Sequence, residues 1–507
     1  MNERYTLSID VGTGSARAAL VDGAGRIVAI AAREHEQIVP QFGWAEQRPQ
    51  EWWKGTVESI RELLDAHPGS ASRIEAIAAC GQMHGTVLVD AAGQLARQTV
   101  PLWNDKRTLD IVHRFEAAHE PNSYLSESGN PPTPAWPGFK LAWLKVHDPE
   151  AYEKAAFVIM PKDYVNLRLT GEIAMDSGDA SCSFLMNPAT RRWSDHMINL
   201  LGIDSSKLPP IREPLDILGN VTAAAARETG LREGTPVLVG AADYTAALLG
   251  SGACRPGLVS DVGGTSLILT LIAEKPLLDP EISNVATIEG NWGPFVLLES
   301  GGDAMRWARR AFHEKTLGYA DIVAKAAEAP AGANALFFLP FLTGQRLGSY
   351  RNARAQFFGL GAGHGLAHLH RAIMEGVAFA GARHLRVMEQ AAQQKVERVM
   401  ASGGAAKTAL WLEIKASIYG VPLLVPAEAE CGVIGSAAMA ATALGQFPGV
   451  QAAISRFVHY SAEVKPNPRW VETYARMQPV FNRIYANSQP LYAALDALLT
   501  DNVVSKD

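Results

Sequence analysis

The sequence predicts an α/β protein made of two copies of one domain, with a cleft between the copies. The chain has 507 residues, more than one ordinary hydrophobic core accommodates. Two segments, residues 7–21 and 257–270, share a pattern in which apolar residues lead to Asp and Val, then to glycines with Thr and Ser, then to alternating apolar residues. Each pattern predicts a strand, a glycine turn and a second strand. Because they lie about half a chain apart, we expect a duplicated domain, with boundaries at 1–245 and 246–507.

The rest of the first half shows further strand and helix patterns. Residues 26–33 predict a third strand, so that three antiparallel strands open the chain. Apolar residues recur at helical spacing over 53–64, after Pro49, a residue favoured in the first turn of a helix. The short apolar run 74–80 predicts a buried strand that ends in a loop.

The second half of the chain also contains strand and helix patterns. Residues 236–240 predict a strand that runs into a loop, and residues 399–405 predict another strand with a glycine junction. Residues 432–445 are rich in small apolar residues but too short to span a bilayer, so we expect a close-packed buried helix. The pattern beyond Trp470 is helical to near Leu499.

Composition and charge exclude several classes of protein. The net charge of −6 provides no attraction for nucleic acid or an anionic membrane. The four cysteines are far apart, so neither a disulfide framework nor a zinc site is expected. The N-terminus, Met1–Tyr5, has no basic stretch followed by an apolar core, so we expect no signal peptide. These features predict a cytoplasmic protein with no nucleic-acid partner and no membrane partner.

The first glycine turn has the composition of a phosphate site. It consists of Gly12, Thr13, Gly14 and Ser15. Glycines let backbone N–H groups approach an anion, and the hydroxyl groups add donors. Arg17 can bring a positive charge to a phosphate, and Asp10 can hold Mg²⁺ through water. A lone glycine hairpin is usually an ordinary turn, but the second copy, with Gly264 and Thr265, predicts two turns that hold a polyphosphate from both sides.

Two other phosphate motifs are excluded. The segment 12–17 has two of the three glycines of the dinucleotide fingerprint, but Arg17 replaces the third and a strand follows instead of a helix. The segment 403–408 resembles a Walker A loop but lacks the glycine before its lysine.

Polar residues at strand ends predict an acceptor site. His84 follows a buried strand and can hydrogen-bond a substrate hydroxyl, or it can be a surface histidine with a backbone partner. Asp243 lies at a strand-to-helix junction, where it can accept a proton from a hydroxyl that attacks phosphorus, or serve as a helix N-cap. Asp105 and Arg107 can face a substrate or pair with each other.

Together these segments resemble the FGGY family of carbohydrate kinases, and within it the xylulokinases, over nearly the whole chain. The matching segments, in order, are residues 8–15, 82–85, 102–105, 161–164 with 169–172, 258–269, 342–346 with 358–360, and 402–405. The resemblance implies two ribonuclease-H-like domains, the architecture of the actin and Hsp70 ATPases, with catalysis in the cleft. It implies a sugar-binding catalytic domain at 1–245, a nucleotide-binding domain at 246–507, and a homodimer as one permitted assembly.

The resemblance also implies the roles of the candidate residues. Asp243 is implied as the general base, and Asp10 as the residue that organises Mg²⁺ for the cosubstrate ATP. The candidate substrate contacts are Met83, His84, Trp103, Asp105, Asp243 and Tyr244. The candidate ATP contacts are Gly12, Thr13, Gly14, Ser15, Arg17, Gly264, Thr265, Gly403, Gly404 and Ala405.

The implied reaction is transfer of the γ-phosphate of ATP to D-xylulose, which gives D-xylulose 5-phosphate. Xylulokinases usually have Asn where this chain has Tyr244, and Glu where it has Gln345. Another small ketose or polyol, such as ribulose, L-xylulose, ribitol or erythritol, therefore stays open as the substrate. The alternative from another class is a non-sugar ATPase of the actin or Hsp70 type, whose ATPase activity no sugar would affect.

Overall fold

The computed structural model describes residues 4–313, 315–345, 347 and 351–504, and the chain forms two compact units. Unit 1 comprises the chain up to Arg255, Glu274–Gly293 and Glu430–His459; unit 2 comprises Pro256–Ala273, Pro294–Ala429 and the chain from Tyr460 onward. Met1–Glu3 and Arg346, on which the sequence arguments drew, lie outside the described residues. The functional halves expected at 1–245 and 246–507 stay a prediction.

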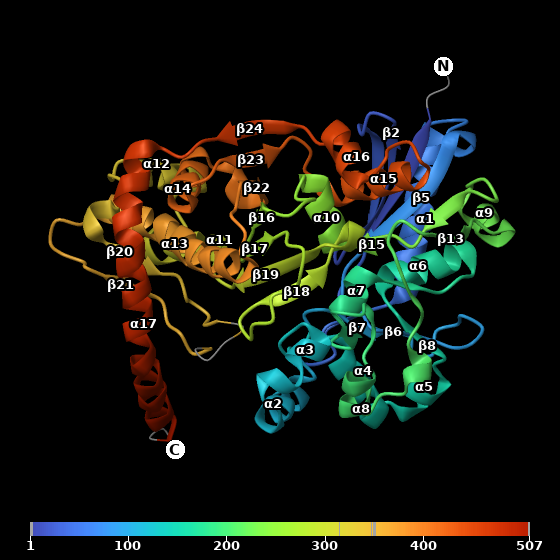
Figure 1. The fold of residues 1–507 in the computed structure, drawn as a ribbon, viewed down its shortest axis with the longest axis horizontal. Coiled ribbons are helices and arrows are strands. Elements are labelled where there is room, and N and C mark those ends of the chain that lie inside the picture. Colours follow the sequence, from blue (N-terminus) through green and yellow to red (C-terminus); the bar gives the residue numbers. More distant parts are fainter. Residues whose placement is uncertain (1–3, 314, 346, 348–350, 505–507) are drawn as a thin grey trace. The chain divides into compact units, whose positions relative to one another are not determined.

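A mixed β-sheet forms the centre of unit 1 (Figure 1). Its strands are β1 (Tyr5–Val11), β2 (Ser15–Asp22), β3 (Ile27–Glu34), β5 (Ile74–Gly81), β13 (Ile217–Asn220), β14 (Pro236–Leu238) and β15 (Ala241–Ala242). The order is β13-β14-β5-β1-β2-β3, and β15 also pairs with β5. The antiparallel β1, β2 and β3 confirm the predicted opening strands, whereas β5 runs parallel to both β1 and β15. The carboxyl ends of β1, β5 and β15 therefore lie at one edge of the sheet.

Helices cover both faces of this sheet. The helices of unit 1 are α1 (Pro49–Ala66), α2 (Leu109–Ala118), α3 (Leu125–Ser128), α4 (Pro137–His147), α5 (Pro149–Lys154), α6 (Pro161–Thr170), α7 (Ser177–Ser181), α8 (Asp195–Leu201), α9 (Ala223–Thr229), α10 (Asp243–Ser251), α15 (Cys431–Ala443) and α16 (Val450–Phe457). Leu7 and Ile9 pack in one core with Trp52 of α1, and Ser8 Oγ donates to the Val433 carbonyl of α15 at 2.9 Å. Successive strand residues face opposite sides, so α1 and α15 cover opposite faces and Asp10 shares the α15 face with Ser8.

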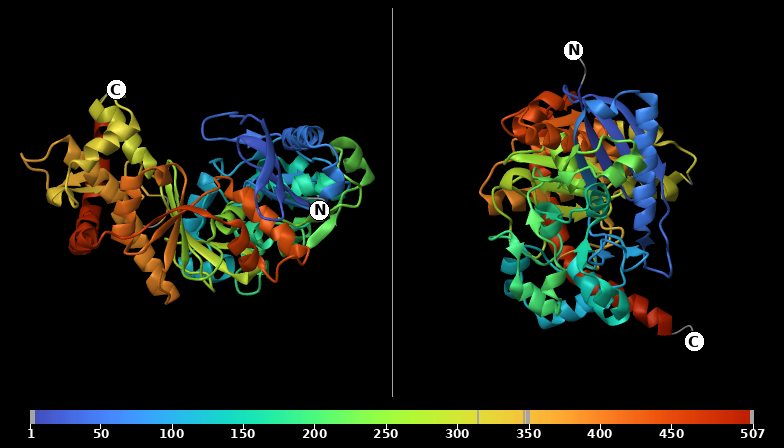
Figure 2. Two further views of the ribbon diagram at one scale, coloured as in Figure 1. Left: turned by 90° about the horizontal axis from the view of Figure 1, so that it is seen from above. Right: turned by 90° about the vertical axis from the view of Figure 1, so that its right-hand side faces the viewer.

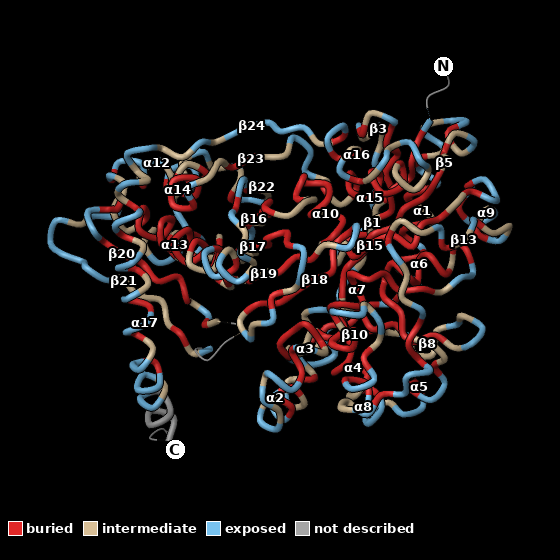
Figure 3. The backbone as a smooth tube through the Cα atoms, in the orientation of Figure 1, coloured by how far each residue is buried: buried red, intermediate tan, exposed pale blue. Residues whose placement is uncertain are grey.

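Helix α15 is the buried, close-packed helix that the sequence predicts at 432–445. Figure 2 shows the late, orange-red helices beside the blue N-terminal strands in both views, and α15 contacts β1, β5 and α10. Figure 3 shows it as a buried element. Gly250 of α10 faces the Cys431 carbonyl and Gly435 faces the Ala246 carbonyl so closely that a Cβ at either glycine would overlap backbone. Only glycine allows these two helices to approach this far.

We expect Gly435→Ala to lower the free energy of unfolding by about 1–3 kcal/mol, because the added methyl group would force α10 and α15 apart. Chemical denaturation of the variant tests this. Gly23→Ala is the matched control, since a Cβ at Gly23 meets no atom within 4 Å and its φ is not positive. Equal stability of the two variants would contradict the close-packing account.

Unit 2 repeats the hairpin of unit 1 on a second mixed sheet. The strands of this sheet that lie wholly or mostly in unit 2 are β16 (Leu258–Gly263), β17 (Leu267–Leu271), β19 (Trp292–Leu298), β22 (Arg398–Ser402), β23 (Leu423–Pro426) and β24 (Tyr460–Val464), in the order β19-β17-β16-β22-β23-β24. Strands β16 and β17 form the predicted antiparallel hairpin, and β22 runs parallel to β16 as β5 runs parallel to β1. The two copies of the glycine hairpin that the sequence predicts are thereby confirmed.

Helices and a small strand pair complete unit 2. These elements are α11 (Gly302–His313), α12 (Tyr319–Ala327), β20 (Phe337–Leu339), β21 (Gln356–Phe358), α13 (Leu366–Ala392), α14 (Ala409–Tyr419) and α17 (Pro468–Val504). The helical pattern beyond Trp470 corresponds to α17, which continues through Pro479 and Pro490. None of the helices in the described part of the chain combines the length and apolarity of a membrane-spanning segment.

Candidate active site

The candidate residues of unit 1 converge at the edge where three neighbouring strands end. The strand register aligns Asp10 of β1 with Cys80 of β5, and Cys80 with Ala241 of β15. The segments that leave the strands at this edge begin at Gly12, Gln82 and Asp243. The fold therefore brings the first glycine turn, the predicted substrate loop and the predicted base to one place in unit 1.

Asp243 is the first residue of α10, and Ala242 holds the N-cap position. The N-cap alternative therefore does not describe Asp243. Its Oδ1 accepts the Tyr244 backbone N–H at 2.6 Å. Burial, and next the negative charge of Asp10, raise the pKa of Asp243 to about 7, against the lowering effect of the Tyr244 N–H. A carboxylate with a pKa near 7 can accept a proton at neutral pH and release it afterwards.

Asp10 has the properties of a carboxylate that holds a metal ion. Its Oδ1 atom is buried and has no hydrogen-bond partner among the described residues. Burial raises its pKa, opposed by Arg17, whose Nη1 lies 3.7 Å from Oδ2. The described residues contain no group of three or more His, Cys, Asp or Glu side chains arranged for a metal. The available Oδ1 of Asp10 is the kind of ligand that Mg²⁺ in nucleotide sites accepts from the protein, alongside phosphates and water.

A hydrogen-bonded network ties the first glycine turn to the predicted substrate loops. Thr13 Oγ1 accepts from the Trp103 indole at 3.1 Å, and the Thr13 carbonyl accepts from Gln47 Nε2 at 2.7 Å. Gln47 Oε1 in turn accepts from Gln82 Nε2 at 2.8 Å and from Trp52 Nε1 at 3.0 Å. The predicted phosphate turn and two of the predicted substrate segments are thus joined into one structure. Gln47 was not found from the sequence, because no local pattern marks it.

The other predicted residues of this turn are placed as follows. The Gly12 N–H donates to the Ser15 carbonyl at 3.0 Å, which closes the turn, and Gly14 is exposed at its tip. Arg17 Nε donates to Ser15 Oγ at 3.1 Å, while its Nη1 pairs with Glu430 at 2.7 Å. Arg17 therefore lies between two carboxylates, Asp10 and Glu430, and part of its charge is already balanced.

A buried lysine that sequence reasoning missed holds the predicted substrate loops together. Lys140 of α4 donates to the His84 carbonyl at 2.7 Å and to the Leu102 carbonyl at 2.6 Å. Burial lowers its pKa to about 7. His84 adopts a φ of 67°, which is uncommon for a residue other than glycine, and its ring meets Trp136 edge-on at 5.0 Å. Met83, next to His84 in the chain, is buried, whereas Trp103 is exposed and donates to Thr13 of the glycine turn.

Of the two alternatives for Asp105, substrate contact or pairing with Arg107, the structure shows the pairing with Arg107. Its Oδ2 accepts from Arg107 Nη2 at 2.7 Å and from the Ala45 backbone at 2.7 Å, and its Oδ1 accepts from the Arg107 backbone at 2.9 Å. The Arg107 guanidinium lies 3.9 Å from the Trp44 ring centroid. Both oxygens of Asp105 are engaged inside the protein, so this geometry favours a structural role over substrate contact.

In unit 2, the candidate nucleotide residues form two neighbouring turns. Gly264 and Thr265 are exposed at the turn after β16, and Gly403 and Gly404 are exposed at the turn after β22. The turns touch, because a Cβ on Gly403 would lie 2.7 Å from the Gly263 carbonyl. Open glycine backbone at the ends of two parallel strands suits the binding of phosphates.

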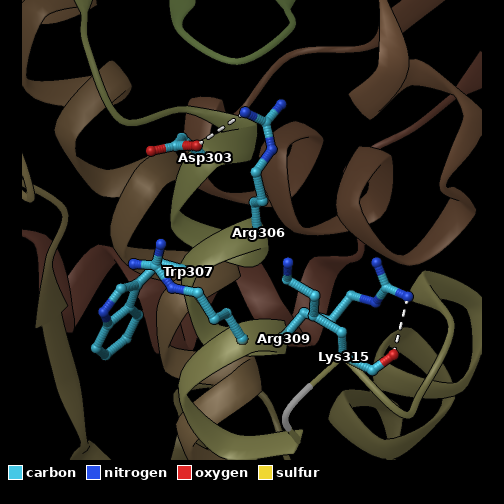
Figure 4. Close-up of a pocket in the computed structure, with 6 residues that line it drawn as sticks. Asp303, Arg306, Trp307, Arg309 and Lys315 are labelled. Atoms are coloured by element: carbon cyan, nitrogen blue, oxygen red, sulfur yellow. Dashed lines mark hydrogen bonds and ion pairs between the residues drawn. The ribbon is translucent and has the colours of Figure 1, made fainter.

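A positively charged pocket on α11 adjoins the first of these turns (Figure 4). It has a volume of about 180 Å³ and is lined by Asp303, Arg306, Trp307, Arg309, Arg310 and Lys315. Arg306 pairs with Asp303 at 3.2 Å and donates to Thr265 Oγ1 at 3.2 Å. Four cationic side chains against one carboxylate give the described lining a net positive charge, which suits an anionic ligand beside Thr265.

Comparisons with known proteins identify the same architecture. The model of the FGGY family of carbohydrate kinases, N-terminal domain, matches residues 5–250, and that of its C-terminal domain matches residues 260–444. The chain is 29% identical to a xylulose kinase of Bacillus subtilis over 97% of this chain and 99% of that protein. It is also 29% identical to an autoinducer-2 kinase of Klebsiella pneumoniae, over 95% and 94%.

The similarity to known kinases also holds for a solved structure. The crystal structure of xylulose kinase from Rhodospirillum rubrum matches with a TM-score of 0.90 and 30% identity, over 97% of this chain and 100% of that one. These matches confirm the predicted two-domain α/β fold.

Proposed function

The chain belongs to the FGGY family of carbohydrate kinases, and from that premise we propose that it transfers the γ-phosphate of ATP to a hydroxyl of D-xylulose. Carbohydrate phosphotransfer follows from the family; the sugar and the residue roles are the proposal. The observation that carries it is the pair of carboxylates, Asp10 and Asp243, at one sheet edge, with the pKa of Asp243 raised to about 7. Asp10 is suited to bind a metal ion, and Asp243 is suited to accept a proton.

Asp243 would act on the acceptor hydroxyl. Phosphoryl transfer needs little covalent help from the protein, so positioning and proton removal are the main tasks of the residues in unit 1. As the bond from the hydroxyl oxygen to the γ-phosphorus forms, the bond from that phosphorus to the oxygen bridging to the β-phosphate breaks, and ADP leaves with the electron pair. The hydroxyl proton passes to the Asp243 carboxylate. Met83, His84, Trp103 and Tyr244 would contact the sugar, and the Lys140 hydrogen bonds to both loops would fix their spacing.

The glycine turns would hold the nucleotide. The open backbone at Gly264, Thr265, Gly403 and Gly404, with Ala405 beside them, would bind the nucleotide phosphates and border its ribose and adenine. Asp10 would hold Mg²⁺, which when bound neutralises phosphate charge. The exposed backbone of Gly14 and the hydroxyl groups of Thr13 and Ser15 would add donors, while the Gly12 N–H closes the turn.

A specific observation supports an alternative acceptor substrate. Two proteins named for different substrates, a xylulose kinase and an autoinducer-2 kinase, resemble this chain to the same degree, 29%. Tyr244, next to the proposed base, replaces the Asn usual in xylulokinases and would alter the hydroxyl pattern that the pocket accepts. A signalling ketose or another small ketose or polyol is therefore the alternative acceptor.

The test is ADP release with Mg·ATP against a panel of acceptors. The panel holds D-xylulose, L-xylulose, D- and L-ribulose, ribitol, erythritol, glycerol and autoinducer-2. We expect D-xylulose to give the highest rate, well above the rate without sugar. A higher rate with another acceptor would reassign the substrate and implicate Tyr244 first. ADP release that no acceptor changes would contradict sugar kinase activity.

A further inference from the structure

A fully buried ion pair lies under the proposed nucleotide turns in unit 2. Lys415 Nζ lies 2.7 Å from Asp261 Oδ1 and 2.9 Å from Oδ2, and both side chains are at most 3% exposed. The Tyr419 hydroxyl donates to Oδ2 at 3.1 Å. Burial, and next the charge of Asp261, raise the pKa of Tyr419, so this hydroxyl stays protonated and donates. Lys415 and Tyr419 lie one turn apart on α14.

The position of Lys415 relates this pair to the two turns. Asp261 lies on β16, two residues before Gly263, opposite Ala401 of β22. A Cβ on Gly263 would lie 2.5 Å from Ala405 Cβ and 3.5 Å from Lys415 Nζ. The ammonium group is therefore directly beneath the place where the segments 263–264 and 403–405 meet.

The carboxylates at equivalent positions of the two hairpin copies have different partners. Asp10-Val11-Gly12 in the first copy corresponds to Asp261-Val262-Gly263 in the second. Asp10 Oδ1 has no hydrogen-bond partner in the part of the chain that the structure describes, whereas both oxygens of Asp261 are engaged by Lys415. In the first copy Oδ1 stays available to a cation, and the nearest protein cation, Arg17, lies 3.7 Å from Oδ2. In the second copy Lys415 engages both oxygens.

We propose that Lys415 is a positioning residue of the nucleotide site, which lets the two turns accept phosphates by neutralising Asp261 beneath them. This rests on the proposed function, in which these turns bind ATP. An unpaired carboxylate at this depth would repel phosphates across a short, poorly screened distance. Lys415 acts through Asp261 and the turns and takes no part in the transfer itself.

The test is MgADP affinity, measured by titration calorimetry without sugar, for Lys415→Met, Asp261→Asn and the double variant. Lys415→Met leaves the Asp261 carboxylate with the Tyr419 hydroxyl but without its cation, so we expect the Kd for MgADP to rise about tenfold or more. Asp261→Asn and the double variant carry no buried anion, so we expect wild-type affinity within about threefold. In steady-state kinetics, we expect Lys415→Met to raise KM for ATP more than KM for D-xylulose.

If the Lys415–Asp261 pair only stabilised the fold, each of the three variants would weaken MgADP binding. Weak binding by the double variant or by Asp261→Asn would overturn the proposal, and these two variants test it even where Lys415→Met does not fold. Arg371→Met is the matched control, because Arg371 pairs with buried Glu375 and Tyr474 elsewhere in unit 2. We expect it to lower the melting temperature without changing MgADP affinity. Wild-type protein that binds no MgADP would instead overturn the proposed function.

Discussion

Asp243→Asn is expected to lower kcat by about 10²–10⁴-fold, because the amide cannot accept the hydroxyl proton. MgADP affinity should stay within about twofold of wild type, since the proposed nucleotide contacts of unit 2 are unchanged. Steady-state ADP release and calorimetric titration of the same preparations measure both quantities. Near wild-type turnover in Asp243→Asn would remove Asp243 as the base.

The pH dependence of the wild type follows from the same residue. A base works only when deprotonated, so kcat should rise about tenfold per pH unit below the pKa of about 7 and level off above it. The profile of kcat between about pH 5.5 and 8.5 measures this limb, because the range brackets the pKa of the base. A flat profile across this range would contradict the assignment.

Stability should change in the opposite sense. The pKa of Asp243 is about 7 in the folded protein and near 3.8 in the unfolded chain, so the native state binds the extra proton between these values. The stability that this proton provides is lost as the pH rises through about 7. Asp243→Asn should therefore become more stable relative to wild type as the pH increases, which thermal unfolding at several pH values measures. An inactive variant that is also less stable at about pH 8, above this pKa, would indicate misfolding, not loss of a base.

Asp10→Asn should lower turnover with Mg·ATP by about 100-fold or more, because the neutral amide is a poor ligand for Mg²⁺. It has a second expected effect. The charge of Asp10 raises the pKa of Asp243, so its removal should move the acid limb of the residual activity to lower pH. The pH profile of kcat for the variant measures this shift.

Asp216→Asn is the matched control for Asp10→Asn. Asp216 is a half-exposed carboxylate paired with Arg212 at 3.3 Å on the surface of unit 1, so its removal should change neither turnover nor the pH profile. If Asp10→Asn loses turnover while the acid limb stays at the wild-type pH, the electrostatic coupling of the two carboxylates is wrong.

The sequence predicted those elements whose structure is determined by residues close together in the chain. Alternating apolar residues around glycine turns specified both hairpins, β1–β2 and β16–β17, and Pro49 marked the start of α1. Asp10 and Asp243 could be found because Asp10 lies near the end of an apolar strand and Asp243 follows one directly. Their proximity could not be predicted this way, since it depends on the parallel pairing of β5 with both β1 and β15.

Buried charges were the main features that the sequence did not reveal. Lys140 and Lys415 lie in helical segments, where a lysine usually faces solvent, and their partners are distant in the sequence: 154 residues separate Lys415 from Asp261. The assembly of unit 1 from three stretches, one of them Glu430–His459, escaped prediction for the same reason. Periodicity describes which face of an element is buried, but not the element that covers it.

The most direct test of the central claim is ADP release from Mg·ATP with and without D-xylulose, in wild type and in Asp243→Asn. The account predicts release that rises many-fold with D-xylulose in the wild type, and loses that rise in the variant while MgADP binding persists. Equal release with and without sugar in the wild type, or a sugar-dependent rise that survives in Asp243→Asn, would contradict it.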